Sequence, residues 1–491
     1  MGIIAKQGIL NSVFSYIGVL LGFLTIVYVQ PIFLKSTEII GLTRILVSFS
    51  FMAAIFIPLG IGSVTVRFFP EIKNTNTKHH GHFFLMFLFC LIGSAFLSLF
   101  FALFKDNITA FYHVKSPLFN EFYYLVFVFP FILALIMVYN IYSASLYKTA
   151  FTVFLNEVLL RVLQIGAIFI YYFGYFDLKQ FILAFVSAYL IQLLLLMGYI
   201  YRVDKFSYKI NWSFYKTFFS NRVILFSALM IFTSFASIGI KMIDQVIMGH
   251  YLSLSSIGIY ATSIFMVSIM EVPINSLERI SNTVAANSWA INDLDNIKKI
   301  YYDSVRVLML IGGYLLCGLI CCSNSIFQIL PEEFEIGKNC MIVMALCSFV
   351  NLSTGINTTI IATSHKYFVI SVFLFVLIST SIITNNWLIP KYGIIGSAYS
   401  TFISIGTYNL LKVIYLWYRL KMLPYNKTSL IIIITILFSG LVYFIPDIAN
   451  PYFNILFKGT VITIIFGFST IKFKIAEEVT SKIPILKSIK L

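Results

Sequence analysis

The stretch ILNSVFSYIGVLLGFLTIVYVQPI, residues 9–32, is a run of mostly apolar side chains without a single charge. One helix needs about 20 apolar residues to cross a lipid bilayer, so this run is long enough. It is too long for the apolar core of a cleavable signal peptide, and no small-residue cleavage site follows it. We therefore expect it to remain in the protein as the first membrane helix.

Runs of the same kind recur along the whole chain. Of its 491 residues, 60% are hydrophobic and 11% are charged, whereas soluble domains average about 45–50% and about 25%. The sequence therefore predicts an all-α integral membrane protein with about 14 transmembrane helices. The expected spans are 10–33, 39–66, 83–104, 121–146, 151–174, 180–201, 223–249, 257–278, 301–322, 339–362, 367–389, 395–417, 429–446 and 453–472.

The basic residues indicate how the chain is oriented. The net charge of +15 is spread over short loops, whereas a nucleic-acid-binding protein gathers its basic residues on one face, so we expect no nucleic-acid partner. With an internal N-terminus, about 22 basic residues fall on the cytoplasmic side and about 7 outside, which follows the positive-inside rule. Both termini are thus predicted to be cytoplasmic. The six cysteines stand in apolar runs without metal-like spacing, so we expect no metal and no cofactor.

Short matches about 217 residues apart indicate an internal duplication. Two six-helix lobes in parallel repeat, followed by two extra helices, account for their order. The expected domains are an N-terminal lobe 1–201, a cytoplasmic amphipathic linker 202–222, a C-terminal lobe 223–418, and two further helices with a basic cytoplasmic tail, 419–491. The matching pairs are Glu38-Ile-Ile-Gly41 with Ser255-Ser-Ile-Gly258, Lys148-Thr-Ala-Phe151 with His365-Lys-Tyr-Phe368, and, at a slightly shorter offset, Ser187-Ala-Tyr189 with Ser397-Ala-Tyr399.

Charged side chains inside the apolar runs are the candidate functional residues, because each costs roughly 2.5–3.5 kcal/mol at mid-helix and tends to face a cavity. Glu157 and Arg161 are four residues apart, and Lys241 and Asp244 are three apart, so each pair can share a helix face. Each pair is either a neutralised structural pair or part of a substrate cavity. In the second interpretation the cations bind an anionic headgroup and the carboxylates carry a coupling ion.

The other intramembrane charges stand alone in their helices. Arg44 has no acid within one turn, so it is a candidate for the substrate site, although it could also snorkel to the nearby membrane surface. Arg306 and Lys412 lie within two turns of helix ends, and we expect them to snorkel. Glu271 stands beside Pro273, which bends helices at moving parts of transporters. The predicted substrate-binding residues are Arg44, Arg161 and Lys241, and the predicted ion-coupling residues are Glu157, Asp244 and Glu271.

Enzyme motifs are absent from the sequence. It contains no Walker A motif, no Gly-x-Ser-x-Gly and no His-Glu-x-x-His. The acidic run Glu332-Glu333-Phe334-Glu335 is interpreted as a solvated external cap rather than a metal site. A glycosyltransferase or polymerase would need longer external loops that carry paired catalytic residues. We therefore expect a transporter rather than an enzyme.

The chain resembles the polysaccharide transporters, or O-antigen flippases, of the multidrug/oligosaccharidyl-lipid/polysaccharide exporter superfamily. The resemblance spans essentially the whole chain and includes the six-plus-six layout. Its motifs are the N-terminal Lys6-Gln-Gly-Ile-Leu-Asn11 through Gly18, then Glu38-Ile-Ile-Gly41-Leu-Thr-Arg44, Arg67-Phe-Phe-Pro70, Lys241-Met-Ile-Asp244, Gly249-His-Tyr-Leu252, Ile257-Gly-Ile-Tyr260 and Tyr392-Gly-Ile-Ile-Gly396-Ser-Ala398.

This resemblance implies a V-shaped molecule of two lobes in a bacterial inner membrane. It would carry undecaprenyl-diphosphate-linked oligosaccharide, such as an O-antigen unit for lipopolysaccharide, to the periplasmic leaflet by alternating access. Its implied partners are this lipid-linked substrate, membrane lipids, and a polysaccharide polymerase or assembly protein. The same superfamily contains cation-coupled multidrug exporters and lipid II flippases, which stay open as alternatives. The slightly basic balance of intramembrane charge favours an anionic cargo.

Overall fold

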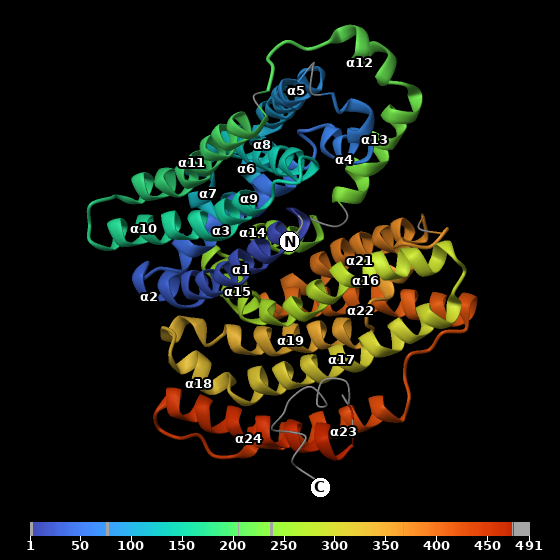
Figure 1. The fold of residues 1–491 in the computed structure, drawn as a ribbon. Coiled ribbons are helices and arrows are strands. Elements are labelled where there is room, and N and C mark those ends of the chain that lie inside the picture. The colour runs from blue at the N-terminus through green and yellow to red at the C-terminus, as the bar shows by residue number, and fades with distance from the viewer. Residues whose placement is uncertain are drawn as a thin grey trace. The chain divides into compact units, whose positions relative to one another are not determined.

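The computed structural model describes residues 3–74, 78–204, 206–235, 239–366, 368–473 and residue 475, and within these residues every regular element is helical. The chain forms two compact units, Met1–Ala261 and Thr262–Leu491. Figure 1 shows the helices in chain order, from blue to red. The predicted all-α class is confirmed.

The first unit contains the helices up to the beginning of α15. Long apolar helices and short helices both occur in this unit. Their bounds are α1 Ile3–Phe23, α2 Gln30–Phe33, α3 Thr37–Ala54, α4 Ile61–Ile72, α5 His82–Leu103, α6 Lys105–His113, α7 Pro117–Glu121, α8 Leu125–Ser145, α9 Ala150–Phe154, α10 Leu160–Tyr172, α11 Leu178–Asp204, α12 Trp212–Phe218, α13 Asn221–Ser234, α14 Ile240–Tyr251 and α15 Leu254–Val267.

The second unit is built around α17, which packs against α16, α19, α23 and α24 (Figure 1). α21 and α22 form a tight antiparallel hairpin, and α22 also packs on α19. The bounds are α16 Glu271–Ala290, α17 Leu294–Cys321, α18 Ser323–Gln328, α19 Gly337–Ser353, α20 Asn357–Ala362, α21 Phe368–Tyr392, α22 Ile394–Leu420, α23 Lys427–Gly440 and α24 Pro451–Lys472.

The described residues contain 11 helices that are long and apolar enough to cross a membrane, or up to 12 if the bent pair α12 and α13 is one span. The predicted count of fourteen is not confirmed. The expected span 339–362 is divided between α19 and the short α20, with Gly355 at φ +65° before α20. α22 covers the expected span 395–417 and is long, but buried serines and Asn409 make one side of it polar. The expected span 223–249 is divided into α13 and α14.

The predicted single helix 39–66 is wrong, because the chain turns sharply between α3 and α4. Pro58 stands in this turn, Leu59 has φ 49° and Gly60 has φ 77°. A side chain at Gly60 would also collide with α13, since an ideal Cβ there would lie 2.6 Å from the Ser227 carbonyl oxygen. The turn thus needs glycine for both its backbone conformation and its close contact.

Two glycines allow α3 and α15 to touch backbone to backbone. An ideal Cβ on Gly41 would lie 1.7 Å from the Leu254 carbonyl oxygen, and one on Gly258 would lie 2.4 Å from the Thr37 carbonyl oxygen. The Thr37 hydroxyl donates a hydrogen bond to Ser255 Oγ over 3.0 Å. Gly41 and Gly258 occupy the same place in the predicted repeat motifs, so equivalent positions of the two halves meet at this crossing.

The first unit extends beyond the predicted N-terminal lobe. α14 packs on α3, and α13 packs on α4, so both helices group with the first six expected spans. The division into 1–201, 202–222, 223–418 and 419–491 remains a prediction. Within the predicted linker, α11 ends at Asp204, Trp212–Phe218 forms the short helix α12, and α13 begins at Asn221. Asn211 accepts a hydrogen bond from the Phe214 amide at the beginning of α12.

Candidate functional site

Arg44 turns its guanidinium group toward a buried amide inside the first unit. Its Nη2 donates a hydrogen bond of 2.8 Å to Oε1 of Gln30, a side chain that is 3% exposed. Gln30 begins α2, after a π-helical segment Leu24–Val29 that widens the first membrane helix. Arg44 Nε is buried without a hydrogen-bond partner among the described residues. The arginine therefore keeps one unused donor in the interior.

Arg161 lies close to Arg44, so the structure brings together two of the three predicted substrate-binding cations. Its Nη1 donates to Gln164 Oε1 over 3.4 Å, and Gln164 in turn donates to the Tyr189 hydroxyl over 3.3 Å. Arg44, Arg161 and Tyr189 lie within electrostatic range of one another. Arg161 Nε is also buried without a partner in the described part of the chain. Two half-buried arginines thus face a common polar region.

The predicted pair of Glu157 and Arg161 does not form. Within the described residues no ion pair joins them. Glu157 lies in a π-helical turn, Leu155–Leu159, between α9 and α10. A π-helical turn bonds i to i+5, so the (i, i+4) register that would align the two side chains is lost. The half-buried carboxylate lies against α1 instead, where an ideal Cβ on Gly18 would be 2.9 Å from Glu157 Oε2.

A polar cluster beside this turn escaped the sequence analysis, which considered only charges. Asn156 Oδ1 accepts hydrogen bonds from Asn140 Nδ2 over 3.3 Å and from Gln192 Nε2. The side-chain oxygens of Asn140 and Gln192 are buried and have no donor among the described residues. These amides come from α8, the π-helical turn and α11. The sequence could have revealed this cluster through its neutral amide side chains within apolar runs, because buried polar groups need hydrogen-bond partners.

The predicted pair Lys241 and Asp244 lies on α14. The Asp244 side chain is 6% exposed and accepts a hydrogen bond of 3.0 Å from the Tyr260 hydroxyl. The side chain of Lys241 lies outside the described part of the structure, so its predicted role stays a prediction. Asp244 is therefore held by α15.

Glu271 is exposed at the beginning of α16. The chain passes from α15 into α16 through a 3₁₀ turn, Ser268–Met270. Pro273 cannot donate to the carbonyl of Ile269, which lies in this turn. The predicted irregularity beside Glu271 is therefore present in the helix.

Lys412 does not snorkel, contrary to the sequence-based expectation. It is 1% exposed on α22, and its Nζ donates a hydrogen bond of 2.8 Å to Thr358 Oγ1 on α20. The ammonium group also lies 4.0 Å from the centre of the Tyr408 ring. Glu278 of α16 is within electrostatic range. Lys412 is thus a buried cation of the second unit, whereas the sequence analysis expected it to snorkel, because proximity to a helix end does not reveal which face is covered.

Arg306 does not extend freely to the membrane surface either. It forms an ion pair of 3.2 Å with Asp303 of the same helix, and the two side chains are 21% and 33% exposed. Among the described residues, no group of three or more His, Cys, Asp or Glu side chains is placed to hold a metal ion. Glu332 and Glu333 are exposed in a short 3₁₀ turn.

Comparison with known proteins places the chain in a family. A family model described as polysaccharide biosynthesis protein matches residues 33–331. The chain belongs to this family. The resemblance found in the sequence motifs is thereby confirmed at the level of the family. No curated protein sequence gives a significant match to this member of it.

Solved structures show which fold this polysaccharide biosynthesis protein has. The lipid II flippase MurJ, in an inward closed conformation, superimposes with a TM-score of 0.74 at 16% identity, over 95% of this chain and 99% of MurJ. An inward-facing multidrug resistance MATE family transporter of the MOP superfamily gives a TM-score of 0.64 at 13% identity, over 82% and 94% of the two chains. The protein is therefore a multi-pass membrane protein with the fold of these transporters.

Proposed function

We propose that this protein is a flippase for a lipid-linked oligosaccharide with a phosphate-bearing headgroup. Its cargo is an undecaprenyl-diphosphate-linked unit of O-antigen or another surface polysaccharide, which it carries from the cytoplasmic to the periplasmic leaflet of a bacterial inner membrane. Membership of the polysaccharide biosynthesis family and a transporter fold support this proposal. In this mechanism the protein binds the cargo on one side of the membrane and releases it on the other by alternating access. No covalent bond of the cargo changes.

The observation that carries the proposal is the pair of arginines in the first unit. A charge inside hydrocarbon costs roughly 2.5–3.5 kcal/mol, and two neighbouring guanidinium groups also repel each other. No carboxylate of the described residues forms an ion pair with Arg44 or Arg161, and each keeps a buried Nε–H without an acceptor. A diphosphate offers several anionic oxygens in the geometry that guanidinium groups bind best.

A carboxylate four residues before Arg161 in the chain fits the role of ion coupling. Glu157 is half-buried in the π-helical turn, and π-helical turns occur frequently at functional sites. Protonation of Glu157 would raise the net positive charge around Arg161 and favour binding of the anionic headgroup. Asp244 and Glu271 remain proposed as further coupling residues, and Lys241 as a further cation for the cargo.

The test is transport in vesicles that contain the purified protein and a fluorescent undecaprenyl-diphosphate oligosaccharide. A membrane-impermeant glycosidase reports how fast the cargo changes leaflet. Losing one charge-assisted hydrogen bond costs about 1.5–3 kcal/mol, so Arg44→Ala and Arg161→Ala should each slow transport by at least about tenfold. Arg202→Ala is the matched control, because Arg202 is exposed at the end of α11. Equal rates in all three variants would refute the assignment of the site.

The same vesicles separate the alternative cargoes. Lipid II tests a lipid II-type flippase, and a cationic dye tests a cation-coupled multidrug exporter. We expect unlabelled undecaprenyl-diphosphate oligosaccharide to inhibit transport of the fluorescent form. Lipid II and the cationic dye should each inhibit this transport less strongly. Glu157→Gln should abolish acceleration by a proton gradient while leaving binding of the cargo intact. In cells, deletion of the gene should leave the lipid-linked oligosaccharide on the cytoplasmic face, where it is unavailable to a polymerase.

A further inference from the structure

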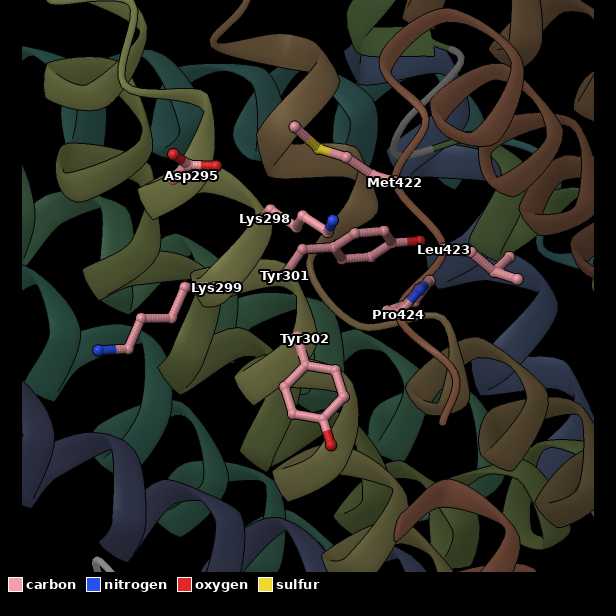
Figure 2. A pocket seen from close by; sticks show the side chains of 8 residues that line it. All are labelled: Asp295, Lys298, Lys299, Tyr301, Tyr302, Met422, Leu423 and Pro424. Atoms are coloured by element: carbon pink, nitrogen blue, oxygen red, sulfur yellow. The ribbon is translucent and has the colours of Figure 1, made fainter. Parts of the chain in front are cut away.

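A cavity of about 280 Å³ lies in the second unit, beside the N-terminal part of α17. Its wall is formed by one face of α17 and by the chain segment that joins α22 to α23. Figure 2 shows the side chains from both parts: Lys298 extends toward Tyr301, and Lys299 extends away from it. The lining residues are Asp295, Lys298, Lys299, Tyr301, Tyr302, Met422, Leu423 and Pro424.

The charges in this cavity favour an anionic ligand. Lys298 and Lys299 are exposed, and none of the ion pairs in the described residues includes either of them. Asp295 is the single acidic side chain of the lining, so the net charge is positive. The cavity also adjoins the N-terminal end of α17, where backbone N–H groups and the helix dipole favour negative charge. The dipole and the two lysines therefore act in the same direction.

The cavity wall contains a buried tyrosine hydroxyl. Tyr301 is 1% exposed, and its hydroxyl has no hydrogen-bond partner among the described residues. Tyr301 follows Lys298 by three residues on α17, so the two side chains share a helix face. A buried hydroxyl without a partner costs about 1–3 kcal/mol. A ligand oxygen that enters between α17 and the segment 421–426 would remove this deficit.

The surroundings of the cavity are those of a membrane surface. Trp417, Tyr418 and Tyr425 are exposed around the end of α22, and aromatic side chains of this kind concentrate where the bilayer meets water. Lys421 Nζ lies 5.6 Å from the centre of the Tyr418 ring. Met422, Leu423 and Pro424 add an apolar side to the cavity. The positive-inside rule predicts that the end of α22 and the segment 421–426 lie on the cytoplasmic side of the membrane.

We propose that this cavity binds the headgroup of an anionic phospholipid of the surrounding bilayer. Lys298 would bind the phosphate, and Lys299 would add to the positive charge near it. Tyr301 would donate its hydroxyl hydrogen to a phosphate or glycerol oxygen, and the acyl chains would follow the apolar side of the cavity into the membrane. Basic pockets between membrane helices on the cytoplasmic side bind lipid headgroups in this way. The site is separate from the proposed cargo site and does not depend on it.

Native mass spectrometry of the full-length protein tests the proposal, with phosphatidylglycerol and phosphatidylethanolamine offered at equal concentration. The wild type should retain phosphatidylglycerol preferentially. Each lysine should contribute about fivefold in affinity, so Lys298→Gln should lower the retained phosphatidylglycerol by about fivefold and the double variant with Lys299→Gln by up to about 25-fold. Lys421→Gln is the matched control, because Lys421 precedes Met422 in the chain, contacts the Tyr418 ring and does not line the cavity.

Tyr301→Phe provides a second measurement that leaves the charges unchanged. It should weaken retention of phosphatidylglycerol by at least about threefold. Equal loss in Lys421→Gln and Lys298→Gln would show diffuse attraction to the surface and overturn the proposal. Retention at the wild-type level in the double lysine variant would also overturn it. Displacement of the lipid by millimolar inorganic phosphate would assign the cavity to a soluble anion instead. Failure of cargo transport in the vesicle assay would leave these outcomes unaffected.

Discussion

The crossing of α3 and α15 permits a quantitative prediction for Gly41→Ala. An ideal Cβ at Gly41 would lie 1.7 Å from the Leu254 carbonyl oxygen and 2.5 Å from its carbon. Ordinary van der Waals contact begins at 3.4 Å, so the two helices must separate by roughly 2 Å at this point. Overpacking of this kind costs about 1–3 kcal/mol. Alanine gains up to about 1 kcal/mol of helix propensity over glycine, which offsets only part of that cost.

The clash acts only in a state in which α3 and α15 touch. A transporter can escape it by populating a state in which these helix ends are apart. A cost of 1–3 kcal/mol corresponds to a shift of about 5–150-fold in such an equilibrium. We therefore expect Gly41→Ala to deplete the state with the helices in contact, and to slow transport of the proposed cargo, which needs both states.

Disulfide cross-linking measures this shift directly. The hydroxyl oxygens of Thr37 and Ser255 are 3.0 Å apart, so cysteines at the two positions should lie within the reach of a disulfide bond. Oxidation should cross-link the Thr37→Cys/Ser255→Cys protein rapidly, and adding Gly41→Ala should slow the reaction by about 5-fold or more.

The control for this experiment is Gly198→Ala on α11, where no atom lies within 4 Å of an added Cβ. That substitution should leave cross-linking unchanged and raise thermal stability slightly through helix propensity. If Gly41→Ala cross-linked as fast as the Gly198→Ala control, the steric argument would be refuted.

Two further predictions concern the buried Lys412 and the more exposed Asp447. Lys412→Met should leave the free energy of unfolding in detergent within about 2 kcal/mol of the wild type, because the lost hydrogen bond and ring contact are balanced by the removal of a buried charge. Thr358→Val should instead lower it by about 1.5–3 kcal/mol, since the Lys412 ammonium loses its acceptor. A thermal melt in which Lys412→Met was the less stable variant would contradict this. Hydrogen bonding, first from Lys458, lowers the pKa of Asp447 from 3.8 to about 2. Its ionised form therefore stabilises the folded protein above pH 3.8, and this contribution is lost as the pH falls toward 2. Asp447→Asn should lower the melting temperature at pH 7, with the difference from wild type shrinking below pH 4; a constant difference down to pH 2 would exclude the carboxylate as its source.

Periodicity and composition were sufficient to predict the helical membrane class, since no soluble fold could cover so much apolar surface. Motif order was sufficient for the family. The cost of a charge in lipid drew attention to Arg44 and Arg161, which the structure places within electrostatic range of each other, and their role in a site stays a prediction. The same reasoning did not find the amides Asn140 and Gln192, because neutral polar residues cost less in lipid and occur in many apolar helices.

The sequence by itself determined which segments are helical and apolar, because these properties depend on side chains within one segment. Only the tertiary structure decided how particular side chains face. The π-helical turn at Leu155–Leu159 separates Glu157 from Arg161 by rotating the helix between them. Packing of α20 against α22 buries Lys412, although its distance from the helix end suggested exposure. The turn at Gly60 and the contact of Gly41 with α15 likewise depend on a second helix, and a pattern along one helix does not contain the position of its neighbour.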